Sequence, residues 1–549
     1  MRVVLAAVVL GLAAASGAAS AGTPGAVATE HALAARAGAD VLAAGGSVVD
    51  AAIAAAAAVC VVHGASCGVG GGGFALVHLA DGRDAALDYR ERAPAALTAA
   101  RFAPGGTVDP TLSRTGGLAV GVPGEVAGWA ALHRRWGRLP LAVVLAPAVR
   151  LARDGFPLSA APHLGREIAR SVALLAADPG LRRDFLGPDG TPPSPDTRIA
   201  RPDLARTLEA IAADDGGGFY RGDLARAIAD TVQARGGVLT VQDLARYRPV
   251  WRRPLVGKFR GRRVVTFPPP GSGAIVLEAL GMLGRDDPSA LGAGSPTWLH
   301  LLAGVLAQAF ADRARWYGDP DFTAVPVPAL LAPARLSALR ARLSAVRVVA
   351  TDAALAPDAG TAHVSVVDAR GNAVAMTTTI NTNFGAGIMV PGTGIVLNDE
   401  IDDFALAPGV GNAYGLTGET PNLVGPGKRP QSSMSPTIVL AGTRPELVVG
   451  ASGGPFIISG TVQVLLGVTA FDRDLPAAVA APRIHDQAPP ALGVESGVDA
   501  DVRALLARLG HRLTELPMVG AVAAAGLRAD GTPVAAGDLR KDGGAATAP

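Results

Sequence analysis

The chain has 549 residues, of which 49% are hydrophobic, so it can fill one large layered domain or two smaller ones. Its formal net charge is only +2 and its basic residues form no long block. This charge pattern argues against nucleic acid or an anionic membrane surface as the main partner.

The first 21 residues have the three regions of a secretory signal. Met1-Arg2 precede an apolar run over 3–15, and Ala19-Ser20-Ala21 fits the small-x-small cleavage pattern. The apolar run is too short for a comfortable membrane span. We therefore expect a signal peptide over 1–21, a mature chain without a membrane span, and export to the periplasm or the medium.

The first part of the chain is expected to be mainly helical. An alanine-rich helix is predicted over 26–59 with a break at 45–47, followed by strands over 74–79 and 85–89. The second of these strands carries Arg90 at its end. From about 121 to 350 the pattern is again helical, and polar or Pro/Gly loops interrupt it.

The two cysteines leave an alternative open. Cys60 and Cys67 could pair in an oxidising compartment. We favour two small buried side chains, because Cys60 ends a predicted helix while Cys67 lies in a glycine loop.

Beyond residue 360 the hydrophobic period changes to that of strands. Short β-type runs at 364–367 and 373–379 flank a turn at 368–372 and predict a hairpin. Further strands are predicted at 438–440 and 446–449, and two helices at 462–471 and 499–509. The combination predicts an α+β layered body.

Some motifs compete for a function. Gly68–Gly73 matches G-x-G-x-x-G but follows a helix, so we interpret it as a tight turn and not as a dinucleotide site. Gly64–Gly68 and Gly450–Gly454 match G-x-S-x-G, and the second lies between a strand and a helix, as a nucleophile elbow does. A serine hydrolase centred on Ser452 is therefore a rival hypothesis, whose acid and base would come from Asp472, Asp474, His485 and His511. The nine histidines show no metal-ligand spacing, so no metal site is expected.

Thr361 is the other candidate nucleophile. A threonine hydroxyl needs a base, and His363 is either that base or an ordinary structural histidine. An α-amino group titrates near pH 8, so cutting the Gly360–Thr361 bond would give Thr361 its own base. Glycine before the bond suits a strained backbone. Spacing alone still favours an ordinary strand threonine.

The motifs around Thr361 change this assessment. They are Gly360–Asp368, Asn381–Gly385, Asn398–Phe404 and Lys428–Thr437, and further motifs precede them in the first part of the chain: Asp50–Ala52, Gly70–Phe74, Asp88–Pro94, Val122–Gly124, Gly236-Gly237, Asp243–Tyr247, Pro268–Pro270, Ala311–Arg313 and Gly318–Phe322. As an ordered set they closely resemble the γ-glutamyltranspeptidases, which are N-terminal-nucleophile hydrolases. The resemblance implies a four-layer αββα sandwich formed jointly by a large subunit, 22–360, and a small subunit, 361–549, after autocatalytic cleavage.

The resemblance also implies roles for single residues. Thr361 would be the nucleophile, Thr379 would orient it, and the backbone N–H groups of Gly453 and Gly454 would form the oxyanion hole. Arg90 would bind the α-carboxylate of a γ-glutamyl group, assisted by Ser432 and Ser433. Asn381, Glu400 and Asp403 would accept hydrogen bonds from its α-ammonium. Tyr414 matches a tyrosine of a lid loop.

The implied activity is that of an exported γ-glutamyltransferase and glutathione hydrolase. Glutathione and other γ-glutamyl amides would be the donors, and water, amino acids or short peptides would be the acceptors. No metal or organic cofactor is needed. The sequence departs from the family pattern at Ala362, Gln431 and Pro455-Phe456, which puts efficiency and acceptor preference in question. Two further alternatives are a glutaryl-cephalosporin acylase and an unprocessed, non-catalytic binding protein on the same scaffold.

Overall fold

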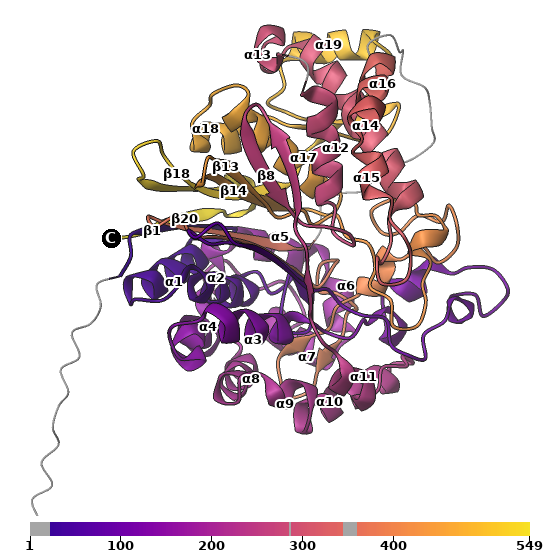
Figure 1. Ribbon diagram of the computed structural model, residues 1–549. Helices are drawn as coiled ribbons and strands as arrows, with labels where there is room; N and C mark the ends of the chain where they lie inside the picture. The colour runs from indigo at the N-terminus through magenta and orange to yellow at the C-terminus, as the bar shows by residue number, and fades with distance from the viewer. Residues whose placement is uncertain (1–21, 285–286, 344–359) are drawn as a thin grey trace, which may run out of the picture.

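The computed structural model describes residues 22–284, 287–343 and 360–549, so the expected signal peptide lies outside the described residues. Two β-sheets lie face to face at the centre, and helices cover the outer face of each (Figure 1). The expected α+β, four-layer αββα sandwich is confirmed. Within the described ranges, each helix is too short or too polar to cross a bilayer.

The first sheet joins strands from both sides of the 360–361 junction. Its seven strands run in the order β20-β1-β9-β10-β2-β3-β6. Their bounds are β1 (Gly25–Thr29), β2 (Gly72–His78), β3 (Asp84–Tyr89), β6 (Val250–Arg252), β9 (Ala362–Asp368), β10 (Ala373–Thr379) and β20 (Gly544–Ala548). The strand that follows the junction, β9, pairs with β1 on one side and β10 on the other.

The second sheet also combines strands from before and after the 360–361 junction. Its six strands run in the order β19-β18-β14-β13-β8-β7. Their bounds are β7 (Leu255–Phe259), β8 (Arg262–Thr266), β13 (Thr437–Ala441), β14 (Arg444–Ser452), β18 (Ala521–Leu527) and β19 (Pro533–Gly537). Smaller sheets are formed by β4 (Phe156–Pro157) with β5 (Arg198–Ile199), by β11 (Met389–Val390) with β12 (Ile395–Val396), and by β15 (Ile484–Ala488), β16 (Ala491–Glu495) and β17 (Arg512–Leu516).

Helices from the first part of the chain cover the outer face of the first sheet (Figure 1). The central one is α2, whose alanine-rich sequence lets it pack closely, since all 15 of its residues are buried. Helices of this side are α1 (Ala32–Ala43), α2 (Val48–Val62), α3 (Glu125–Trp136), α4 (Leu141–Asp154), α5 (Pro162–Arg170), α6 (Val172–Ala176), α7 (Pro179–Phe185), α8 (Pro202–Ala213), α9 (Gly217–Tyr220), α10 (Asp223–Ala234) and α11 (Val241–Arg246).

The outer face of the second sheet is covered by helices from the middle and end of the chain (Figure 1). They are α12 (Gly273–Leu283), α13 (Pro288–Leu291), α14 (Pro296–Trp316), α15 (Val327–Leu330), α16 (Pro333–Leu343), α17 (Phe456–Thr469), α18 (Leu475–Ala480) and α19 (Ala500–Arg508). Apolar residues of α12, α14 and α17 form one core with the inner faces of both sheets.

Several local expectations need correction. Residues Gly25–Thr29 form a strand and not the start of a helix, because β1 fills the position between β9 and β20. Strands β6–β8 interrupt the region predicted as helical, and α17 begins at Phe456, before the predicted 462. Cys60 and Cys67 form a disulfide, with their Cα atoms 4.9 Å apart, contrary to the favoured expectation of free thiols.

Candidate active site

The β9–β10 hairpin brings two threonine hydroxyls together. Thr378 pairs with Ala362 at the end of the ladder, so Thr379 and Thr361 lie opposite each other just beyond it. Their Oγ1 atoms are 3.0 Å apart, and the Thr379 oxygen also accepts a hydrogen bond of 2.8 Å from the Asn381 backbone. This contact is compatible with the predicted role of Thr379 in orienting the Thr361 hydroxyl, which stays a prediction.

The backbone at the junction has an uncommon conformation. Gly360 has φ = +64° and Thr361 has φ = +67°, a region that a β-branched residue rarely adopts. A Cβ atom at 360 would lie 1.6 Å from the carbonyl oxygen of Asn381, so only glycine fits there. Hydrogen bonds fix both amides: Gly360 donates to Asn383 Oδ1 at 3.1 Å, and Thr361 to the Ser66 carbonyl at 2.9 Å.

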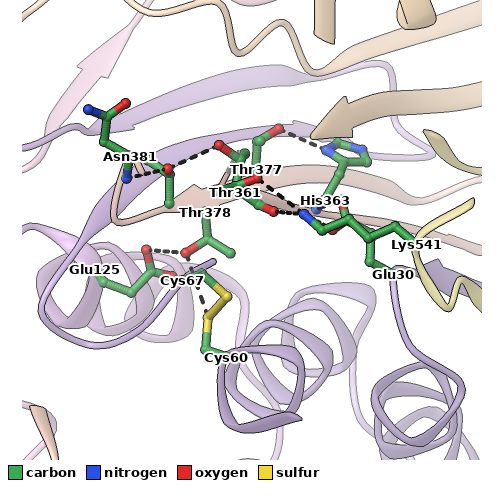
Figure 2. The surroundings of a disulfide bond; sticks show 12 residues. Glu30, Cys60, Cys67, Glu125, Thr361, His363, Thr377, Thr378, Asn381 and Lys541 are labelled. Atoms are coloured by element: carbon green, nitrogen blue, oxygen red, sulfur yellow. Dashed lines mark hydrogen bonds and ion pairs between the residues drawn. A yellow bond between two sulfur atoms is a disulfide. The ribbon is translucent and has the colours of Figure 1, made fainter. Parts of the chain in front are cut away.

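A lysine that the sequence did not single out contacts the carbonyl side of this junction. Lys541 Nζ donates to the Gly360 carbonyl at 3.1 Å and to the Thr361 carbonyl at 2.7 Å. It also contacts Ser452 Oγ at 3.0 Å and forms an ion pair of 2.9 Å with Glu30 (Figure 2). Lys541 follows Thr361 by 180 residues, and no local motif marks it.

Thr361 and Thr379 open into a small, narrow pocket. Every site residue that the sequence predicted lines it except Gly453. The lining residues are Arg90, Thr361, Thr379, Asn381, Glu400, Asp403, Tyr414, Ser432, Ser433, Met434, Gly454 and Ile457.

Arg90 is the charged centre of this pocket. Its guanidinium contacts a carboxylate oxygen of Glu400 and lies 2.5 Å from Asp403 Oδ2. It also donates to the backbone carbonyls of Pro430 and Gln431, at 3.4 and 3.1 Å. The side chain is 1% exposed, and although burial opposes it, the charges of Glu400 and Asp403 raise the pKa of Arg90. Arg90 is therefore cationic throughout the working pH range.

The Glu400 carboxyl, on the acidic side of the pocket, has a raised pKa. Burial raises the pKa of Glu400 to about 7, while the neighbouring Arg90 opposes that rise. Glu91, 3.8 Å from the Arg90 guanidinium, is buried as well, and burial raises the pKa of its carboxyl well above the usual value. The ionisation of Glu400, and with it the affinity for a cation, changes between about pH 6 and 8.

Tyr414, which the sequence predicted to belong to a lid loop, lines the pocket. Its hydroxyl donates to the Asn381 carbonyl at 3.0 Å. Its ring lies over Gly454, where a Cβ atom would be 2.7 Å away from it. The Asn381 side chain donates at 3.1 Å to the Asp399 carbonyl, so it is held by the acidic turn.

The remaining predicted residues are Gly453-Gly454, in a tight turn, and Ser432-Ser433, in an irregular segment before β13. Gly453 and Gly454 have φ = +114° and +56°, between β14 and α17, with Pro455 as the N-cap of the helix. Ser432 is fixed by a hydrogen bond of 2.8 Å from its amide to Pro270, and its Oγ accepts from Met434 at 3.2 Å. Ser433, which lines the pocket beside it, is 6% exposed.

The serine-hydrolase rival is not assembled. Ser452 is fully buried and contacts Lys541, whereas His485 bonds to Ser459 at 2.8 Å and His511 to His300 at 2.8 Å. The candidate acid Asp474 caps the start of α18. These two histidines and Asp474 are therefore committed elsewhere in the fold.

His363 is a structural histidine. Its nitrogens bond to Thr377 and Ser365 at 2.8 and 3.1 Å, and burial lowers its pKa to about 3. Among the described residues, no group of three or more acidic, histidine or cysteine side chains could hold a metal ion.

Comparisons with known proteins agree with this geometry. The family model described as Gamma-glutamyltranspeptidase matches residues 34–548. A glutathione hydrolase proenzyme of Escherichia coli (strain K12) is 38% identical over 525 residues, covering 94% of this chain and 90% of that protein. An acylase ACY 1 proenzyme of Pseudomonas sp. (strain SE83) is 37% identical and covers 95% and 93%. The crystal structure of a cephalosporin acylase from Bacillus halodurans matches with a TM-score of 0.84 at 31% identity, covering 96% of both chains. The chain belongs to the γ-glutamyltranspeptidase family.

Proposed function

We propose that this protein is a γ-glutamyltransferase and glutathione hydrolase, made as a proenzyme that cuts itself between Gly360 and Thr361. The observation that carries the proposal is the position of the Thr361 hydroxyl, 3.0 Å from that of Thr379 and at a pocket containing Arg90, Glu400 and Asp403. The large subunit would be 22–360 and the small subunit 361–549, and the protein would be exported.

The released α-amine of Thr361 supplies the base. It takes the proton of Oγ1 as this oxygen attacks the γ-carbonyl carbon of the donor, and Thr379 holds Oγ1 in position. The amide N–H groups of Gly453 and Gly454 stabilise the oxyanion. The leaving amine takes the proton, and water or an acceptor amine then attacks the acyl-enzyme.

Charge at the far end of the pocket selects the acyl group. A γ-glutamyl group ends in an α-carboxylate and an α-ammonium, and the pocket offers a guanidinium beside two carboxylates. The α-carboxylate is bound by Arg90, Ser432 and Ser433, and the α-ammonium by Asn381, Glu400 and Asp403. Each charge of the donor then replaces part of an existing ion pair, so no buried charge is left without a partner.

A glutaryl-cephalosporin acylase is the second candidate, because two of the similar proteins described above are named acylases. A glutaryl group carries the carboxylate but no ammonium. Glu400 and Asp403 would then have no donor charge to bind. The carboxylates of Glu400 and Asp403 therefore favour glutamyl donors over glutaryl donors.

The decisive experiment combines protein chemistry with one assay. N-terminal sequencing of the purified mature protein should find a chain that starts at Thr361, and a γ-glutamyl anilide should be hydrolysed faster than the matching glutaryl anilide. Preference for the glutaryl compound would support the acylase. A single uncut band without activity would support the non-catalytic binding protein.

A further inference from the structure

We propose that Lys541 is a catalytic residue of the self-cleavage step. Its ammonium group would stabilise the negative charge that forms on the carbonyl oxygen of Gly360 when Thr361 Oγ1 attacks. The inference rests on the proposed cleavage site between Gly360 and Thr361. It names the group that stabilises the oxyanion formed in this cleavage.

The position of Lys541 carries the proposal. Lys541 lies in a 3₁₀ turn (Leu539–Lys541) just before β20 and is 0% exposed. From there its side chain reaches Thr361 (Figure 2). Its Nζ lies 3.1 Å from Gly360 O, the carbonyl oxygen of the scissile peptide bond. This distance is within the range expected for a donor to an oxyanion.

Two further contacts aim the ammonium at that oxygen. Glu30, at the end of β1, forms the 2.9 Å ion pair with Nζ and also accepts a hydrogen bond of 3.0 Å from the His363 amide in β9. Ser452 Oγ lies 3.0 Å from Nζ on the second sheet. The cation is thus held between the two sheets beside the scissile bond. A charge buried this way is costly unless it is paired, and Glu30 supplies the pair.

The chemical step balances with these groups. Thr361 Oγ1 forms a covalent bond to the Gly360 carbonyl carbon, and the hydroxyl proton is transferred to the Thr361 nitrogen. The carbonyl oxygen becomes an oxyanion that accepts a hydrogen bond from Lys541 Nζ. When the oxyanion collapses, the carbon–nitrogen bond breaks and leaves an ester between Gly360 and Thr361 Oγ1. Water then hydrolyses the ester, giving the Gly360 carboxylate, the free Thr361 hydroxyl and the α-amine.

Lys541 is separate from the pocket that would bind the donor. The residues that line the pocket do not include it, whereas Gly454, proposed for the donor oxyanion, is one of them. The two carbonyl groups attacked by the same Oγ1 would therefore be polarised by different groups: Gly360 O by the lysine, the donor γ-carbonyl by backbone amides. The effect of removing the lysine should consequently be largest on cleavage.

The test measures cleavage of the full-length precursor over time on denaturing gels. We expect Lys541→Met to slow cleavage by roughly 10²–10³-fold, as loss of one oxyanion donor does, and Lys541→Arg to be less impaired than Lys541→Gln. Lys428→Met is the matched control, because Lys428 Nζ also donates to two backbone carbonyls, those of Pro421 and Leu423. It should cleave at the wild-type rate.

Hydroxylamine separates the chemical step from folding. It cleaves esters and should accelerate a precursor that already forms the ester. If Lys541 acts on the oxyanion that precedes the ester, hydroxylamine will not restore cleavage in Lys541→Met. Restoration to the wild-type rate, or equal rates for the Arg and Gln variants, would overturn the proposal. Failure of the wild-type chain to cleave at 360–361 would instead refute the proposed function.

Discussion

The backbone nitrogen of Thr361 donates a hydrogen bond of 2.9 Å to the carbonyl oxygen of Ser66. The Cys60–Cys67 disulfide, drawn in Figure 2, closes a short loop. Ser66 belongs to this loop. The same loop also holds the start of the segment after β10, since the Ser66 carbonyl accepts from Ile380 at 3.3 Å and the Ala65 carbonyl from Phe384 at 2.8 Å. The loop therefore holds the nitrogen that would become the catalytic base in the proposed function.

Removing the disulfide should weaken this arrangement. For the double variant Cys60→Ala/Cys67→Ala we expect a loss of about 2–3 kcal/mol in unfolding free energy, because a loop with a sequence separation of 7 is no longer closed in the unfolded chain. Cleavage should also slow, since Ser66 is less firmly placed. Denaturant titration of the Thr361→Ala precursor, with and without the cysteines, measures the first effect. Equal midpoints with equal slopes would contradict it.

Gly360→Ala should block cleavage without a change at the nucleophile. The added methyl group would lie 1.6 Å from Asn381 O, and the alanine backbone would have to adopt a positive φ. The junction must therefore shift away from Lys541 and Ser66. A denaturing gel should show only the uncut chain. Gly392→Ala is a suitable control, because that glycine also has a positive φ but no atom within 4 Å of the added Cβ. It should cleave normally.

The affinity for a zwitterionic donor should depend on pH through Glu400. Because burial raises the pKa of this carboxyl to about 7, ionised Glu400 increases from about a tenth at pH 6 to about nine tenths at pH 8. The KM for a γ-glutamyl anilide should therefore fall as pH rises through this range. The effect on folding has the opposite sign: the protonated carboxyl stabilises the fold fully below about pH 4.5 and less as pH rises through about 7.

A glutaryl anilide provides the control for this pH effect, since it has no ammonium for Glu400 to bind. Its KM should stay constant or rise over the same range. Glu400→Gln should remove the pH dependence of KM for the γ-glutamyl donor. A γ-glutamyl KM that is flat between pH 6 and 8 in the wild-type enzyme would contradict the assigned role of Glu400.

Arg90→Lys should not be a conservative change. Arg90 places its guanidinium between two carboxylates and two backbone carbonyls, a geometry that a single ammonium cannot match. Loss of one or two charge-assisted hydrogen bonds, each about 1.5–3 kcal/mol, should reduce kcat/KM by about 10²-fold. Self-cleavage, followed on the same preparation, should proceed at the wild-type rate because Gly360 O is bonded to Lys541. Equal losses in both reactions would indicate a general folding defect.

The sequence predicted the β9–β10 hairpin, which depends on a local pattern, and it singled out residues that line the pocket, whose roles stay predictions. Alternating apolar residues and a turn at 368–372 set the β9–β10 register, which places Thr361 opposite Thr379. Family motifs located Arg90 and Glu400, which the structure brings within contact. Each of these residues lies in a recognisable stretch of sequence.

Long-range contacts were missed for the corresponding reason. Strand β1 resembles the alanine-rich helix that follows it, and only pairing with β9 and β20 makes Gly25–Thr29 extended. Lys541 is 180 residues away from Thr361 in the sequence, and a single lysine there belongs to no recognisable motif. The disulfide depends on the turn between α2 and β2, which brings two Cα atoms to 4.9 Å, a distance that spacing alone does not give.

The interleaved strands of the first sheet determine how the cleaved protein would unfold. β9 and β10 come from one side of the junction, yet their neighbours β1 and β2 come from the other, so neither piece has a complete sheet by itself. Refolding after cleavage would require two chains to meet in solution. The unfolding midpoint of the mature protein should therefore rise with protein concentration, while that of an uncut Thr361→Ala chain should stay constant. The uncut chain would fold as one molecule, whereas the stability of the cut protein would depend on the concentration of its two subunits.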